Sequence, residues 1–184
     1  MTRTRNPELT RAALLEAAKR VLQTQGAGLS LEAVAREAGV SKGGLLHHYP
    51  SREALLWALA LELVERFRAS VEAARAHEVA AHGQRPGAWL RAYLEVSFTP
   101  GAGEEALIAA LAPLAGHPEL IARLQEAQAF VLSGAEDDGL PRGRAHAVRL
   151  ACDALSLGPL TGLPDLSPEA REALREELLA WTRT

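Results

Sequence analysis

Two short helices joined by a tight turn are the feature that most constrains this chain. Ser30 is the expected N-cap of a helix over residues 31–38, and Ser41 that of a helix over 42–48, because a serine hydroxyl accepts a hydrogen bond from the free N–H groups of a first turn. Gly39 lies between them, where a tight or left-handed turn disfavours a Cβ. This spacing predicts a helix-turn-helix, whose second helix lies in the major groove of DNA.

The rest of the chain has the composition of an all-α protein. Aromatic residues make up only 4%, Ala, Leu, Glu and Arg dominate, and the alternating pattern of strands is nearly absent. Capping residues, prolines and glycines mark the helix ends. They predict nine helices, over residues 7–25, 31–38, 42–48, 52–81, 86–98, 104–114, 118–136, 142–157 and 168–183.

The net charge of −3 conceals an asymmetry along the chain. Residues 1–55 carry eight Lys/Arg against five Asp/Glu, a net +3, whereas residues 56–184 carry twelve against eighteen, a net −6. Charge attracts phosphate only within a Debye length of about 8 Å, so the acidic remainder does not exclude DNA binding at the N-terminal end. A solvated surface accounts for the same imbalance, and charge alone does not decide between the two.

Polar residues around the third predicted helix are candidates for contact with DNA phosphates. Ser41 and the backbone N–H groups behind it can point toward a phosphate, and Lys42 adds a mobile cation. Arg52 adds a second cation at the start of the next helix. A plain surface loop is the alternative for any one of these residues, but their combination at this spacing favours DNA.

Glycines and histidines complete the candidate DNA contacts. Gly43 and Gly44 each cost about 1 kcal/mol relative to alanine inside a helix. Their use is close approach of the backbone to the groove, which lets His47 and His48 reach bases or phosphates. Taken as an isolated pair, the two histidines fit solvated surface residues better, and adjacent positions on a helix do not suit a metal site.

The stretch "RAALLEAAKRVLQTQGAGLSLEAVAREAGVSKGGLLHHYPSREALL", residues 11–56, resembles the TetR family of bacterial transcriptional regulators. The chain departs from the family pattern at Leu46, where a tyrosine is usual, at Gly44, where Thr or Ala is common, and at Tyr49, where Phe is usual. Tyr49 is a candidate source of the missing hydroxyl, although packing under the motif suits it better.

The resemblance implies a helix-turn-helix DNA-binding domain over residues 1–51 and a helical ligand-binding and dimerisation domain over 52–184. It implies a homodimer that binds double-stranded DNA at a palindromic operator, with repression released by a small molecule of unknown identity. The candidate ligand residues are Trp89, Tyr93, Phe98, Leu111, His117, Leu124, Gln128 and Phe130. The candidate dimer-interface residues on the last two helices are Val148, Ala151, Leu155, Leu174, Leu178 and Trp181. These two helices would alternatively cover the core of their own chain.

Other functional classes find less support. No nucleophile with a base, phosphate loop or metal motif is apparent, and His77 and His82 are five residues apart where a helical zinc motif needs four. We therefore expect no enzyme, no metal and no cofactor.

No apolar run approaches the roughly 18 residues of a membrane span or the core of a signal peptide, so we expect a cytoplasmic protein without membrane contact. The single Cys152 excludes an internal disulfide, and it lies in an apolar run that suits a buried thiol. The stronger rival is a helical homodimer that kept the fold but acts through protein partners.

Overall fold

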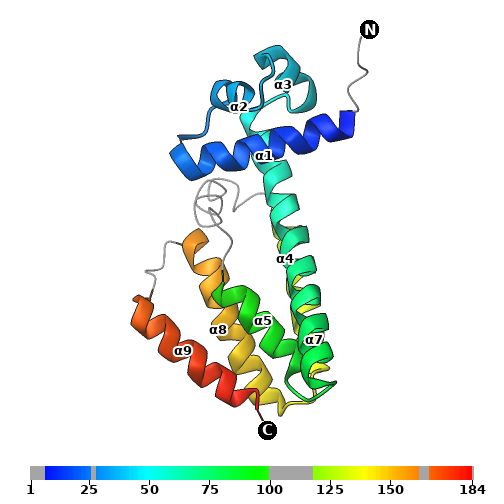
Figure 1. Ribbon diagram of the computed structural model, residues 1–184, viewed down its shortest axis with the longest axis vertical. Helices are drawn as coiled ribbons and strands as arrows, with labels where there is room; N and C mark the ends of the chain where they lie inside the picture. The colour runs from blue at the N-terminus through cyan, green and yellow to red at the C-terminus, as the bar shows by residue number, and fades with distance from the viewer. Residues whose placement is uncertain (1–6, 26–27, 100–117, 162–165, 184) are drawn as a thin grey trace. The chain divides into compact units, whose positions relative to one another are not determined.

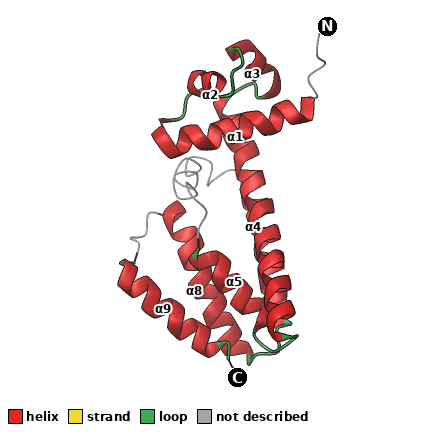
Figure 2. Cartoon of the chain, viewed as in Figure 1, coloured by secondary structure: helices red, strands yellow, loops and turns green. Residues whose placement is uncertain are grey.

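The computed structural model describes residues 7–25, 28–99, 118–161 and 166–183 (Figure 1). Figure 2 shows helices joined by loops in this part of the chain, which confirms the all-α prediction. The eight described helices are α1 (Pro7–Gln25), α2 (Leu31–Glu37), α3 (Lys42–His48), α4 (Arg52–His82), α5 (Ala88–Phe98), α7 (Pro118–Glu136), α8 (Arg142–Thr161) and α9 (Pro168–Trp181). The helix predicted over residues 104–114 lies outside the described residues.

The described residues form two compact units. Those up to Glu62 belong to the first unit and those from Leu63 onward to the second. Helix α4 contributes its first residues to the first unit and the rest to the second. The functional domain boundary after residue 51 stays a prediction.

The helix-turn-helix of the first unit forms at the predicted residues. The Ser30 hydroxyl accepts a hydrogen bond from the Ala33 N–H at 3.2 Å, and the Ser41 hydroxyl accepts one from the Gly44 N–H at 3.0 Å. Gly39 has a φ of 66°, in the left-handed region that a Cβ disfavours. The two caps and this turn therefore determine where α2 ends and α3 begins.

The core of the first unit joins α1 to the other helices. Its buried apolar residues are Leu14, Ala17, Ala18, Val21, Leu22, Leu29, Ala33, Val34, Ala35, Leu45, Tyr49, Leu55, Leu56, Leu59 and Ala60. Ion pairs cross the edges of this core, from Arg20 of α1 to Glu37 of α2 at 2.6 Å and from Lys19 of α1 to Glu62 of α4. Leu45 places α3 in the same core, so the position of α3 depends on the packing of the other helices of this unit.

The second unit is built around α5, which packs against α7, α8 and α9. Its core residues are Val71, Trp89, Leu90, Tyr93, Leu94, Val131, Ala135, Leu140, Ala145, Val148, Cys152 and Leu178. Gly134 of α7 is required here, because a Cβ at this position would lie 2.1 Å from the Trp89 ring. Burial raises the pKa of the Cys152 thiol to about 12, and Cys152 is the buried thiol that the sequence indicated.

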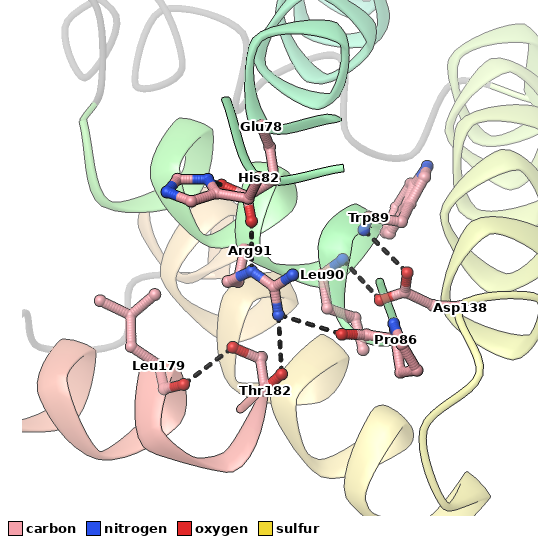
Figure 3. A network of polar contacts seen from close by, with 9 residues as sticks. All are labelled: Glu78, His82, Pro86, Trp89, Leu90, Arg91, Asp138, Leu179 and Thr182. Carbon is pink, nitrogen blue, oxygen red and sulfur yellow. Dashed lines mark hydrogen bonds and ion pairs between the residues drawn. The ribbon is translucent and has the colours of Figure 1, made fainter. Parts of the chain in front are cut away.

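Helix α5 begins two residues later than the sequence predicted. Its N-cap is Gly87, with a φ of 82°, and the side chain that caps the helix comes from Asp138, after α7. The Asp138 carboxylate accepts hydrogen bonds from the backbone N–H groups of Trp89 at 2.8 Å and Leu90 at 2.9 Å, as Figure 3 shows. The helix start is therefore set by a residue almost fifty positions away, which local sequence patterns do not reveal.

Helix α8 is longer than predicted. It continues through Gly158 and Pro159 to Thr161, where the sequence predicted an end at Leu157. A proline removes one backbone donor from a helix and disfavours its continuation without forbidding it. No described helix is long and apolar enough to cross a membrane.

Candidate nucleic-acid interface

Helix α3 presents most of the predicted DNA contacts to solvent. The exposed residues at and after its N-cap are Ser41, Lys42, Gly43, Gly44 and His47, and Leu46 and His48 are half-buried. Leu45 is fully buried and anchors the helix to the first unit. The rings of His47 and His48 meet edge to face, with centroids 5.3 Å apart. The helix therefore offers a polar face whose N-terminal half carries little side-chain bulk.

Lys42 forms an ion pair with Glu32, across the turn between α2 and α3. The hydrogen bond from the Lys42 ammonium is the largest cause of a pKa of Glu32 below its usual value. Both side chains are more than half exposed, so water and salt screen the pair and it exchanges readily for another partner. Glu32 is a residue that the sequence reading missed, since only the folded turn brings position 32 to position 42.

Arg52 links the start of α4 to the segment that precedes the helix-turn-helix. Its Nε donates a hydrogen bond to the carbonyl oxygen of Leu29 at 2.9 Å, in the segment that leads into α2. The side chain is thus tied to the helix-turn-helix at the residue where α4 begins. A phosphate contact by Arg52 stays a prediction, with this second role beside it.

Tyr49 lies underneath α3 and is only 2% exposed. The Arg11 guanidinium lies over its ring, 5.1 Å from the centroid, and its hydroxyl is 3.5 Å from the Arg11 carbonyl oxygen. Burial raises the pKa of the Tyr49 hydroxyl. This placement agrees with the packing role, and the burial disfavours a contact between the hydroxyl and DNA.

The aromatic candidates for a ligand site come together in the second unit. Trp89 stacks on Tyr93 with centroids 5.3 Å apart and meets Phe130 edge-on at 5.8 Å. Trp89 and Tyr93 are buried core residues, and the half-buried candidates are Phe98, Leu124, Gln128 and Phe130. His117 and Leu111 lie outside the described residues.

A buried polar network adjoins these aromatic side chains. The Tyr93 hydroxyl donates a hydrogen bond to Asp153 at 2.5 Å, and Arg149 donates to the same carboxylate at 2.6 Å and to the Gln128 side chain at 3.3 Å. Burial and the neighbouring carboxylate raise the pKa of Tyr93 well above its usual value. Arg149 and Asp153 were not among the predicted ligand residues, because this network joins three separate helices and no local pattern reveals it.

A cavity of about 410 Å³ lies between α4, α5 and α7. Trp89 and Phe130 form its aromatic part, and the Arg68 guanidinium lies 5.0 Å from the centroid of the Phe130 ring. Its charged lining is Arg68, Glu72, Arg75, Glu126, Asp137 and Asp138. Two of the predicted ligand residues, Trp89 and Phe130, therefore border a cavity. Among the described residues, no group of three or more His, Cys, Asp or Glu side chains could hold a metal ion.

The candidate dimer residues divide between the core and the surface. Val148 and Leu178 are buried in the core of their own protomer, so in this structure they pack within the chain. Ala151, Leu155 and Leu174 are half-buried, and Trp181 is 40% exposed. Leu150 of α8, which the sequence reading did not select, is 56% exposed.

Two family matches cover most of the chain. Residues 14–59 match the family described as bacterial regulatory proteins, tetR family. Residues 87–183, more than half of the 184 positions, match the tetracyclin repressor-like C-terminal domain. The chain belongs to the TetR family. As a TetR-family member, the protein is a DNA-binding transcriptional regulator, and the first match contains all eight candidate DNA contacts.

Several solved structures share the fold over nearly the whole chain. The multidrug binding protein EbrR, in complex with malachite green, is 26% identical with a TM-score of 0.62, over 95% of this chain and 98% of EbrR. A TetR-family transcriptional regulator from Streptomyces coelicolor is 23% identical with a TM-score of 0.62, over 96% and 95% of the two chains. NalD, the secondary repressor of the MexAB-OprM multidrug efflux pump in Pseudomonas aeruginosa, is 22% identical with a TM-score of 0.54, over 96% and 97%. No curated protein matches the chain by sequence.

Proposed function

We propose that this TetR-family regulator is a cytoplasmic repressor that binds a palindromic operator as a homodimer and leaves it when a small molecule binds the second unit. The exposed N-terminal half of α3, anchored by the buried Leu45, is the observation that carries the DNA-binding part. Ser41 and Lys42 contact phosphates, and His47 reaches base edges in the major groove. The half-sites would lie about one helical turn, ~34 Å, or somewhat more apart.

Two observations support the remaining parts of the proposal. The exposed Leu150 and Trp181 give α8 and α9 apolar surface that a second copy would cover. The cavity beside Trp89 and Phe130 is the proposed effector site, and EbrR, which shares the fold, binds malachite green. To release DNA, the effector must bind the DNA-incompetent dimer more tightly than the DNA-bound one.

Selection from random duplex DNA, at two salt concentrations, tests the operator directly. We expect a palindrome whose binding weakens steeply as salt rises, because each neutralised phosphate releases counterions. We expect Lys42→Ala to weaken binding to all sequences and to reduce the slope of log K against log salt by about two, one for each protomer. Glu32→Gln removes the competing carboxylate and should have the opposite effect on affinity.

The exposed Arg144 of α8 provides the matched control, since Arg144→Ala removes a cation from the other unit. An unchanged salt slope in Lys42→Ala would reject the phosphate contact. No enriched sequence in the selection would instead favour the homodimer that acts through protein partners.

Gly43→Ala separates stability from DNA binding. A Cβ at Gly43 would meet no atom closer than the Ser41 hydroxyl, at 4.0 Å, so the change should stabilise α3 by up to about 1 kcal/mol. If the α3 backbone lies against the groove, the same methyl group should weaken operator binding about tenfold. Thermal unfolding and fluorescence anisotropy measure the two effects. Gly143→Ala, with nothing within 4 Å, should stabilise the protein without changing its affinity for DNA, and equal affinities of both variants would exclude close approach.

A further inference from the structure

A second cavity, of about 520 Å³, lies at the other side of α5 from the aromatic residues. Its walls come from the end of α4, from the segment between α4 and α5, from α5 and from the second half of α9. Figure 3 shows Glu78, Pro86 and Thr182 around the Arg91 side chain. The volume is within the range of about 300–1,000 Å³ that small-molecule sites occupy. None of the predicted ligand residues lines it, so it is a separate place from the proposed effector site.

The charge of this cavity is opposite in sign to that of the whole chain. Four arginines line it, Arg85, Arg91, Arg175 and Arg183, against the two glutamates Glu78 and Glu95. With His82 neutral, the lining carries a net charge of +2, in a chain of net charge −3. A basic cavity in an acidic protein selects for anions.

Arg91 is the rigid centre of the cavity. Its Nε donates to Glu78 at 2.6 Å, and its Nη1 donates to the carbonyl oxygens of Thr182 at 2.7 Å and Pro86 at 3.1 Å. The negative charge of Glu78 is thereby balanced, because its carboxylate accepts a hydrogen bond from the Arg91 guanidinium at short range. Arg91 holds the ends of α4 and α9 together and positions the walls of the cavity.

The other three arginines have N–H donors that no described residue accepts from. Neither the Arg85 nor the Arg183 guanidinium forms an ion pair or side-chain hydrogen bond with any described residue. Among the described residues Arg175 pairs with Glu172 alone, at 3.0 Å, and that pair is exposed to solvent. Planar guanidinium groups bind carboxylate and phosphate oxygens with two parallel hydrogen bonds. The cavity thus presents three weakly engaged cations around a fixed fourth.

We propose that this cavity binds a small anion that carries two or more carboxylate or phosphate groups. Arg85 and Arg183 contact the anionic groups, and the side chains of Leu94 and Leu179 provide an apolar wall for a short carbon skeleton. The site does not depend on DNA binding or on the effector cavity. Its occupancy links α9, one of the two proposed dimerisation helices, to the last turn of α4.

Isothermal titration of the full chain with citrate and with inorganic pyrophosphate, at constant ionic strength, tests the site, with neutral sorbitol as the reference. We expect saturable binding of at least one anion, with one site per chain. The double variant Arg85→Gln/Arg183→Gln should weaken it at least tenfold, or 1.4 kcal/mol. Arg144→Gln, which removes an exposed cation of α8 outside the cavity, should stay within twofold of the wild type.

Two results would overturn the assignment: no saturable binding of either anion to the wild type, or an equal loss in Arg144→Gln. The double variant should fold normally, because it leaves Arg91 and its contacts intact, and thermal unfolding without anion checks this. Its operator binding should equal that of the wild type. A failure of the anion site and a failure of the proposed DNA binding are therefore separate outcomes.

Discussion

Replacing Asp138 with alanine is expected to lower the free energy of unfolding by about 2–3 kcal/mol. The carboxylate accepts hydrogen bonds from the Trp89 and Leu90 N–H groups at 2.8 and 2.9 Å, and Asp138 is only 7% exposed. Alanine leaves two buried donors without an acceptor, and each costs about 1–3 kcal/mol. Burial raises the pKa of Asp138, so desolvation of its charge offsets part of this gain and keeps the expected loss below the full sum.

Urea unfolding of two further variants isolates the cap. Asp138→Asn keeps one carbonyl oxygen as an acceptor, so we expect about half of the loss. Asp137→Ala removes an exposed neighbour whose carboxylate is 3.4 Å from the Ser133 hydroxyl, and it should change stability by less than about 0.5 kcal/mol. Equal losses in Asp137→Ala and Asp138→Ala would show that the cap does not stabilise α5.

The helix-turn-helix could be predicted to within a residue because its determinants are local. Ser30 and Ser41 cap helices that begin at the next residue, and Gly39 adopts the left-handed φ between them. Each of these effects operates within four positions, which is the range over which propensity and capping act. The family resemblance covered the same stretch, and the residues alone had already indicated it.

Contacts between distant residues could not be predicted in this way. The Asp138 cap of α5 joins residues 48 and 49 positions apart, and Arg91 donates to a carbonyl 91 positions away. Periodicity identifies an apolar stripe but not the surface that covers it. For this reason Val148 and Leu178, selected for a dimer interface, lie in the protomer core, whereas the exposed Leu150 went unselected.

The candidate ligand site could likewise be predicted only in part from the sequence. Trp89, Tyr93 and Phe130 were selected as apolar residues of the right region, and they do pack together. The charged partners that would give such a site chemical selectivity, Arg149 and Asp153, lie on α8. Asp153 accepts hydrogen bonds from Arg149 and from Tyr93 of α5. Selection of these partners requires knowing which helices lie side by side, and that information is not in any one segment.

Replacing Arg91 with alanine is expected to cost about 2–3 kcal/mol at neutral pH, because it leaves Glu78 and two backbone carbonyls without their shared donor. The ion pair between Arg91 and Glu78 is largely shielded from solvent, with side chains 15% and 18% exposed. Partial burial acts to raise the pKa of Glu78, but the hydrogen bond and charge of Arg91, with His82, outweigh it and hold that pKa below its usual value. The ion pair therefore stabilises the fold above the unfolded pKa of Glu78, about 4.5, and this part is lost as the pH falls through the folded value.

Urea unfolding of the wild type and Arg91→Ala at about pH 7 and about pH 3.5 separates the contribution of the Glu78 ion pair from that of the two carbonyl contacts. We expect the difference between them to shrink at the lower pH, because this pH lies below the unfolded pKa of Glu78, and to keep a remainder from the contacts with Pro86 and Thr182. Arg123→Ala is the matched control, because its pair with Glu126 is exposed and contributes about 0.5 kcal/mol or less. A loss that is the same at both pH values would assign the whole effect to the carbonyl contacts. In that case Arg91 would position the walls of the cavity through the Pro86 and Thr182 carbonyl oxygens rather than through Glu78.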